Sequence, residues 1–339
     1  MAGQVTLDDV ARLSGVSPAT ASRALNGRPG VRDESRERVR RVAESLGFRP
    51  NRAARQLASG RSSVIGLILP TGDHVDAYGA AILHAVGRAA AAADQGLMLH
   101  LAAREPARAV QHVLRDGLVD GVLVSSIGIG TRWIDELLAA DLPTVLIGSH
   151  PFRDDVDAVD VENLESSAAA VGHLFEQGCE RVGLIAGPQD RADARARLAG
   201  YRLAHERADR RVDETLVVGG DFTRDSGRRC GDLLACRDVD GVFASNDDMA
   251  RGAMWAFSQR GLRVPEDVAL VGFDGTAIDE LVAPTLTSVC QPFDEIAQMA
   301  VSELLTVIGG GRRSGAVLVA PELRVGGTSI RRPGAETPG

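Results

Sequence analysis

The residues best suited to chemistry in this chain are polar side chains at the ends of short apolar runs. Ser125, Asn246 and Asp274 occupy such positions. Their hydroxyl, amide and carboxylate groups suit hydrogen bonding to a polar ligand. The sequence contains no nucleophile elbow, no P-loop and no dinucleotide-binding glycine motif. The pattern therefore favours binding of a polar molecule over catalysis.

The elements that must position these residues begin near residue 62, where short apolar runs alternate with helical stretches. This alternation is typical of a parallel α/β sheet. Ligands of such sheets lie outside the carboxyl ends of the strands, so we expect the polar residues to line a cleft. The predicted strands are 64–69, 97–102, 121–126, 144–149, 181–187, 241–246 and 268–273.

This part of the chain repeats itself. The letters IGLILP, DGVLVSS and VLIGSHP, which start at residues 65, 120 and 145, resemble VGLIAGP, DGVFASN and ALVGFDG, which start at 182, 240 and 269. Three matches in one order and at similar spacing predict two similar doubly wound subdomains that face each other across the cleft.

The first 60 residues read as short helices. Thr6 is a natural N-cap, and Asp9 stands where a capping box needs an acidic partner. A second helix is expected to begin after Ser17 with Pro18 at its first position and to end at Gly27. Two further helices are predicted at 33–47 and 51–60.

Charge is distributed unevenly along the chain. Residues 1–60 hold 11 arginines against 6 acidic residues, whereas the whole chain has a net charge of −8. A basic head on an acidic body indicates a polyanionic partner for the head, although a solvated charged helix would show the same composition. Aromatic residues make up only 4% of the chain, which disfavours stacking on single-stranded nucleic acid.

Other classes are disfavoured by the sequence. The four cysteines form no CxxC pair, so we expect no metal site and no cofactor. The first residues lack the apolar core of a signal peptide, and the alanine-rich stretch 80–103 is interrupted by charged and histidine side chains. We therefore expect a cytoplasmic protein with no membrane partner.

Residues 5–27, VTLDDVARLSGVSPATASRALNG, closely resemble the helix-turn-helix headpiece of the LacI/GalR family of bacterial transcriptional regulators. The resemblance continues through 47–70, the family's hinge helix and first core strand, and reaches about residue 331. It implies a small all-α headpiece followed by an α/β core like that of periplasmic binding proteins. It also implies a repressor that responds to a small polar metabolite, most plainly a sugar or sugar derivative.

The resemblance assigns roles in DNA binding. The helix after Ser17 would enter the major groove, where Arg23 would bridge O6 and N7 of guanine. Pro18 and Ala19 can offer only shape and an apolar contact to a thymine methyl group. Leu57 would wedge into the minor groove and kink the duplex, although a small-core role is an alternative. The expected DNA contacts are Thr6, Leu7, Ser17, Pro18, Ala19, Thr20, Ser22, Arg23, Asn26, Asn51, Ala54 and Leu57.

The resemblance also assigns an effector site. Arg197 would clamp paired hydroxyls or a carboxylate, and Asp274 would accept hydrogen bonds from hydroxyls. Asn246 could cap a helix, bind the ligand or do both, and Phe222 could stack on the ligand or belong to the core. The expected effector contacts are Tyr78, Ser125, Arg197, Phe222, Asn246, Asp274, Gln291 and Phe293.

One position departs from the family pattern. Arg32 stands where family members usually carry the serine or threonine that caps the third helix. We expect Asp33 to cap that helix one residue later.

The resemblance implies three partners for the chain. These would be a pseudo-palindromic double-stranded DNA operator, a small-molecule effector and a second copy of the chain in a homodimer. Alternatives are a nucleoside- or purine-responsive regulator, a solute-binding receptor, and an enzyme suggested faintly by GFDGT. The expected parts are a headpiece (1–49), a hinge helix and linker (50–61), an N-subdomain (62–160 with 291–320), a C-subdomain (161–290 with 321–331) and a disordered tail (332–339).

Overall fold

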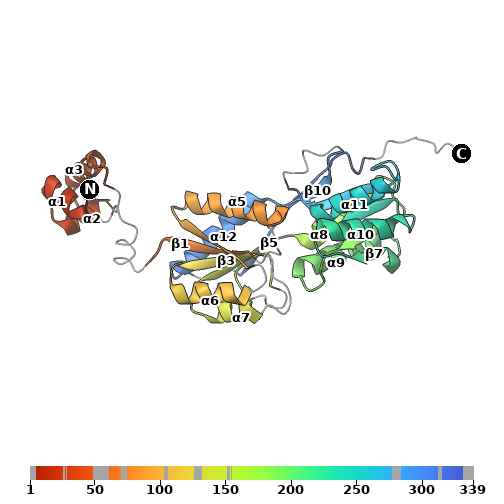
Figure 1. The fold of residues 1–339 in the computed structure, drawn as a ribbon, viewed down its shortest axis with the longest axis horizontal. Helices are drawn as coiled ribbons and strands as arrows, with labels where there is room; N and C mark the ends of the chain where they lie inside the picture. Colours follow the sequence, from red (N-terminus) through yellow and green to blue (C-terminus); the bar gives the residue numbers. More distant parts are fainter. Residues whose placement is uncertain are drawn as a thin grey trace. The chain divides into compact units, whose positions relative to one another are not determined.

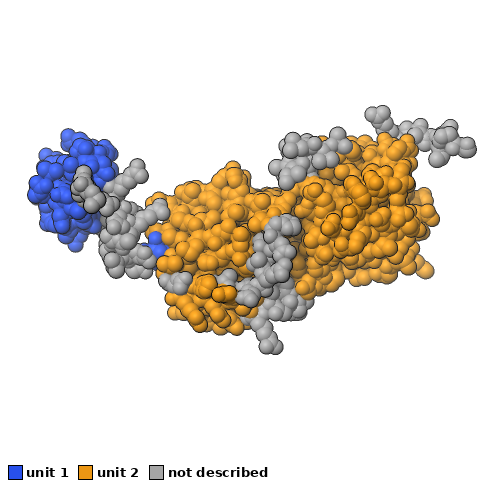
Figure 2. Space-filling model, viewed as in Figure 1, with its two compact units in different colours: residues 1–62 blue, residues 63–339 orange. Residues whose placement is uncertain are grey.

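A computed structural model describes most of the chain, which forms two compact units, residues 1–62 and 63–339 (Figure 2). Within the described part, no helix is long and apolar enough to cross a membrane. The described residues are 5–25, 27, 29–48, 61–69, 75–102, 106–125, 132–150, 153, 155–276, 284–311 and 315–330.

The first unit is built from three short helices whose starts follow the capping signals in the sequence. The Thr6 hydroxyl accepts from the Asp9 N–H, and the Asp9 carboxylate accepts from the Thr6 N–H at 3.0 Å, which completes the predicted capping box. The Ser17 hydroxyl accepts from the Thr20 N–H at 3.2 Å at the start of the second helix. Gly15 adopts a φ of 65° in the turn between them. The helices are α1 (Leu7–Ser14), α2 (Pro18–Leu25) and α3 (Asp33–Ser45).

The third helix corrects one expectation. Asp33 is its first residue and not its cap, because Arg32 occupies the N-cap position with extended backbone and makes no side-chain cap hydrogen bond. Asp33 and Glu34 instead lie in the first turn, where the positive end of the helix dipole favours carboxylates.

The second unit contains two six-stranded sheets with the same strand order (Figure 1). Each strand of the first sheet has a counterpart in the second: β1 with β6, β2 with β7, β3 with β8, β4 with β9, β5 with β10 and β11 with β12. The predicted repeat is therefore a duplication of topology. In order across the first sheet, the strands are β11 (Ala316–Val319), β5 (Ala158–Val161), β4 (Thr144–Ile147), β3 (Gly121–Ser125), β1 (Val64–Leu69) and β2 (Gly96–Leu101). In order across the second sheet, they are β12 (Glu322–Arg324), β10 (Thr287–Cys290), β9 (Ala269–Asp274), β8 (Gly241–Ala244), β6 (Val182–Ala186) and β7 (Val217–Gly219).

Helices cover both faces of each sheet (Figure 1). α12 follows β10 in the chain but packs against the first sheet, so the chain crosses from one sheet to the other at residues 291–292. One continuous apolar core lies on the α5 and α12 face of the first sheet and the α8 and α9 face of the second. The helices are α5 (Ala77–Ala92), α6 (Pro106–Asp116), α7 (Arg132–Ala139) and α12 (Phe293–Ile308) on the first sheet, and α8 (Asn163–Glu176), α9 (Ala192–Arg207), the 3-10 turn η1 (Glu214–Leu216), α10 (Arg224–Ala235) and α11 (Asp247–Gln259) on the second.

The structure adds strands that the sequence analysis did not predict: β5, β7, β10, β11 and β12. All ladders are parallel except that β12 pairs antiparallel with β10. The doubly wound prediction is confirmed for both halves, with an antiparallel edge strand on the second sheet.

Two helices of the second sheet pack unusually closely. A Cβ atom on Gly252 of α11 would lie 2.1 Å from the carbonyl oxygen of Arg224 on α10, and a Cβ atom on Gly227 would lie 2.2 Å from that of Met249. Both contacts involve backbone atoms, which cannot move without separating the helices.

We expect Gly252→Ala to lower the free energy of unfolding by about 3 kcal/mol, because an overpacked site must push two helices apart. Gly172→Ala is the matched control, since Gly172 is also helical and no atom lies within 4 Å of the place that an alanine Cβ would take. The control should be neutral or stabilising by up to about 1 kcal/mol. Urea unfolding measures the free energy of unfolding of both variants. Equal changes in Gly252→Ala and Gly172→Ala would contradict the close packing of α10 against α11.

Candidate functional site: an exposed helix face and a polar cleft

The α2 helix presents two different faces. Ala21 and Ala24 are fully buried in the core of the first unit. Pro18, Ala19 and Arg23 are exposed on the outer face. Among the described residues, no acidic side chain forms an ion pair with Arg23. A short helix with a small inner face and one long cationic side chain outside suits insertion into a DNA groove.

The cleft of the second unit is centred on Arg197 of α9 and Asp274 at the end of β9. Both are almost completely buried. Arg197 Nε donates to the Asn163 carboxamide oxygen at 2.9 Å, and Nη1 donates to the Ser245 carbonyl at 2.6 Å. Nη1 also lies 3.6 Å from Asp274 Oδ1. The guanidinium is therefore fixed from several sides, as a binding clamp requires.

The backbone and the protonation of Asp274 are both unusual. Its φ of 116° is a conformation that residues other than glycine rarely adopt. The Gln291 amide donates to its carboxylate at 2.8 Å. Burial raises the pKa of Asp274 to about 7, against the opposing effects of Arg197 and Gln291. A strained, buried carboxyl with a raised pKa is a common property of ligand-binding sites.

Asn246 performs the capping role that the sequence allowed. Its side-chain oxygen accepts from the Met249 N–H at 2.9 Å at the start of α11, and its amide donates to the Phe222 carbonyl at 2.9 Å. Phe222 is half-buried at the cleft with a φ of 67°. The hydrogen bond from the Asn246 amide fixes the backbone that carries the Phe222 ring, and both residues line the same side of the cleft.

The first subdomain contributes Tyr78 from the start of α5. Its ring packs edge-on against Phe293, with 5.7 Å between centroids. Burial raises the pKa of the Tyr78 hydroxyl well above its usual value, and the nearby Ser125 hydroxyl partly opposes this rise. Ser125 is fully buried at the end of β3. Tyr78 and Gln291 border the cleft. Ser125 and Phe293 are not among its lining residues, but both interact with Tyr78.

Sequence reasoning missed a charged pair in this cleft. Arg191 and Asp193 form a two-pronged ion pair, with Nε–Oδ1 and Nη2–Oδ2 distances of 3.0 and 2.7 Å. The Arg191 guanidinium also lies 5.1 Å from the centroid of the Phe222 ring. Burial opposes ionisation of Asp193, but the guanidiniums of Arg191 and Arg197 hold its pKa below the usual value.

A second missed group is Asp160 at the end of β5. Its carboxylate accepts from the Ser149 hydroxyl at 2.6 Å, from the Val161 N–H at 2.7 Å and from the Asn163 amide at 3.3 Å. Burial raises its pKa. The strand-end rule would have found Asp160 if the run AVDV had been recognised as a strand.

The cleft is nearly filled by these side chains. Its two neighbouring cavities have volumes of about 30 and 20 Å³. Such volumes hold a water molecule or two but no sugar ring. A metabolite can enter only if the two subdomains move apart or the side chains rearrange.

Comparison with known proteins places the chain in a family. Residues 6–51 match the bacterial regulatory proteins of the lacI family, and residues 171–329 match a periplasmic binding protein-like domain. The HTH-type transcriptional regulator CelR of Thermobifida fusca is 37% identical over 316 residues, which cover 88% of this chain and 92% of CelR. The chain belongs to the LacI family.

Solved structures extend this result to the whole fold of the LacI-family chain. A CelR–cellobiose complex superposes with a TM-score of 0.75 at 33% identity and covers 96% of this chain and 99% of its own. A lac repressor dimer bound to operator superposes with a TM-score of 0.81 at 27% identity, with coverage of 97% and 100%. The chain is a DNA-binding transcriptional regulator and not an enzyme.

Several predicted DNA contacts of this LacI-family chain lie outside the described residues: Asn26, Asn51, Ala54 and Leu57. The predicted hinge helix at 51–60 and the tail at 332–339 lie outside them as well. The described contacts all belong to α1, α2 and the residues just before them.

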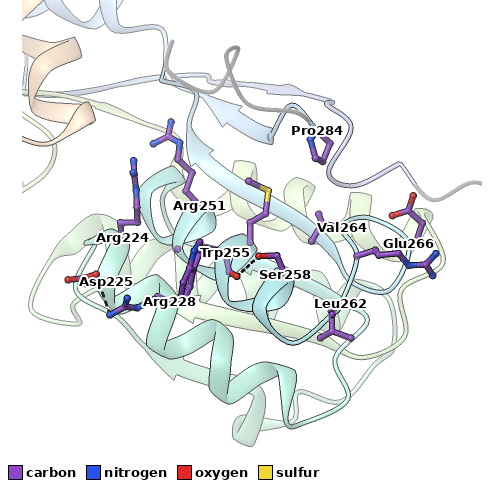
Figure 3. Close-up of a pocket in the computed structure, with 14 residues that line it drawn as sticks. Arg224, Asp225, Arg228, Arg251, Trp255, Ser258, Leu262, Val264, Glu266 and Pro284 are labelled. Atoms are coloured by element: carbon purple, nitrogen blue, oxygen red, sulfur yellow. Dashed lines mark hydrogen bonds and ion pairs between the residues drawn. The ribbon is translucent and has the colours of Figure 1, made fainter.

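A wide groove is lined by residues of α10, of α11 and of the segment that follows α11 (Figure 3). It shares no lining residue with the two cavities of the cleft. Its volume is about 970 Å³. Trp255 is half exposed there, and the Arg228 guanidinium lies 5.3 Å from its ring centroid. Leu262, Val264 and Pro284 extend the apolar lining, and charged residues of both signs surround it.

Proposed function

We propose that this regulator is a repressor whose affinity for its operator is set by a sugar or sugar derivative bound in the cleft. The observation that carries the proposal is the buried Arg197–Asp274 pair, together with Asn246 and Phe222. A fixed guanidinium and a carboxylate can bind vicinal hydroxyls, and an aromatic ring can cover the apolar face of a sugar. The complex of CelR with cellobiose supports the same ligand class.

The cleft also supplies a means of transmitting the signal. Arg197, Asp274 and Phe222 belong to the second sheet's layer, whereas Tyr78 and Asp160 belong to the first. A ligand that contacts both groups would favour one relative arrangement of the subdomains by its difference in affinity for the two arrangements. In this proposal, the change in the arrangement of the subdomains is transmitted to the hinge segment 50–61 and alters its affinity for DNA.

For the DNA complex, we propose that the Arg23 side chain recognises guanine. We further propose that a second group of residues contacts the sugar–phosphate backbone of DNA and so fixes the position of α2: Thr6, Leu7, Ser17, Thr20 and Ser22. Pro18 and Ala19 would add shape and apolar contact only. The operator would be pseudo-palindromic because a symmetric dimer presents two copies of α2.

The function is tested by thermal-shift screening of the full chain against sugars, purines and nucleosides, followed by operator-binding measurements with each stabilising compound. We expect a sugar to raise the melting temperature and to change DNA affinity at the same concentration. Stabilisation by a purine or nucleoside alone would replace the proposed ligand class, and a ligand with no effect on DNA binding would contradict the regulatory link.

We further propose that the chain is a homodimer and that the groove around Trp255 contributes to its interface (Figure 3). The half-exposed Trp255 is the kind of residue that anchors interfaces. Arg224, Arg228 and Arg263 alternate with Asp225 and Glu266, so a second copy in twofold contact can match the charges. The lac repressor dimer supports this choice of partner.

We expect Trp255→Ser to raise the dimer dissociation constant about 30-fold or more, because loss of a buried interface tryptophan removes at least about 2 kcal/mol. Leu118→Ser is the control, since Leu118 is exposed to a similar degree as Trp255 but does not line the groove. Sedimentation over a range of concentrations measures both. Equal behaviour of the two variants would exclude the groove from the interface.

A further inference from the structure

Each arginine that lines the cleft forms an ion pair with an aspartate. Two arginines, Arg191 and Arg197, and four aspartates, Asp76, Asp160, Asp193 and Asp274, line the two cavities. Arg191 is paired with Asp193 and Arg197 with Asp274. Neither guanidinium is left over for a further anion.

The protonation of the aspartates does not change this conclusion. With all four ionised, the cleft carries two more negative than positive charges. Burial raises the pKa of Asp160 and of Asp274, which favours their neutral forms. Even with both protonated, Asp193 keeps its charge, because Arg191 and Arg197 hold its pKa below the usual value, and it still neutralises Arg191.

The helix N-termini at the cleft are occupied as well. The Asp76 carboxylate accepts from the Gly79 N–H at 2.7 Å at the start of α5, and Asp193 accepts from the Ala194 N–H at 2.9 Å in the first turn of α9. Asn246 caps α11. The partial positive charge that would attract a phosphate or carboxylate is therefore already satisfied.

Resting on the effector site proposed above, we propose that the effector is an uncharged polyhydroxyl compound and that the cleft rejects phosphorylated and acidic sugars. A hydroxyl can enter between a guanidinium and its carboxylate because it accepts from one and donates to the other. An anion can only accept, so it would have to displace Asp193 from Arg191 and leave a largely buried carboxylate without its partner. The paired charges thus act as a filter for ligand charge.

The first test compares matched compounds on the wild-type full chain by calorimetry: glucose with glucose 6-phosphate, and cellobiose with cellobionate. Where a pair binds, we expect the charged member to bind at least about tenfold more weakly. A charged member that binds as tightly as its neutral partner overturns the charge filter but leaves the proposed regulation by a sugar derivative intact. If neither member of any pair binds, the proposed effector class loses its support, and the filter is decided by the second test.

The second test uses inorganic phosphate as the probe and thermal stability as the readout, against chloride at equal ionic strength. Asp193→Asn removes the counter-charge of Arg191, so phosphate should stabilise this variant more than wild type. The control is Asp155→Asn, because Arg153 and Asp155 form the same two-pronged pair at the same spacing on the surface. We expect no gain in that variant. Equal stabilisation of all three proteins, or none in Asp193→Asn, would overturn the proposal.

Discussion

Replacement of Arg23 by alanine is expected to remove most of the discrimination between the operator and random duplex DNA. A bidentate contact to guanine contributes about 1–3 kcal/mol of discrimination, which corresponds to a change of about 5- to 150-fold. The headpiece should remain folded, because Arg23 is exposed and alanine favours helix. The measurement is affinity for a duplex selected from a random pool by the wild-type protein, relative to unselected duplex.

Two further variants separate base reading from charge. Arg41→Ala removes another exposed positive charge of the headpiece, from α3, and should weaken binding to selected and unselected DNA alike. Arg23→Lys keeps the charge without the planar fork and should lose discrimination as the alanine variant does. Full discrimination by Arg23→Lys would mean that charge alone, and not a guanidinium contact, is required.

Replacement of Asp274 by asparagine is expected to weaken the effector response about 30-fold or more while leaving DNA affinity within about twofold. Removing one partner of a buried, hydrogen-bonded charge pair costs about 2 kcal/mol or more. Asparagine keeps the shape of the side chain, so the strained backbone at φ 116° is preserved. Asp155→Asn, which breaks an exposed ion pair with Arg153, is the control and should change neither property. An unchanged dose curve for Asp274→Asn would remove this residue from the effector site.

The same variant changes the pH dependence of stability. Because the pKa of Asp274 is about 7 in the folded protein and near 3.8 in an unfolded chain, the folded state holds this proton more tightly. Its contribution to stability is therefore present below about pH 4 and is lost as the pH rises towards and through 7. Urea unfolding of wild type and Asp274→Asn at pH 5 and pH 7.5 should show a smaller decline in the variant.

The parts of the fold that could be predicted from sequence carry local signals. The capping box of Thr6 and Asp9 needs only a three-residue spacing, and the long apolar runs mark the inner strands. β10 escaped prediction because Thr287 and Ser288 look exposed by residue type. Both are buried because their hydroxyls bond to the distant residues Ser329 and Asp247, which no local pattern reveals.

The site shows the same division. Arg197 and Asp274 were found through the family resemblance, and the structure brings them within 3.6 Å of each other. Arg191 and Asp193 were missed because their spacing is the same as that of Arg153 and Asp155, which form an equivalent pair in solvent. Only the tertiary fold decides which of two identical local patterns lines a binding cleft.

The alanines inside the headpiece have a consequence for how mutations in this protein will be read. Among the described residues of the headpiece, the fully buried core consists of two valines and the four alanines Ala11, Ala21, Ala24 and Ala43. Such a core has no room for larger side chains, and a small domain has little stability to lose. A genetic screen for loss of DNA binding should therefore yield two classes on one helix, contact mutations on its outer face and folding mutations at Ala21 and Ala24. Growth temperature separates them, because cooling can rescue a marginally folded headpiece but cannot restore a missing contact.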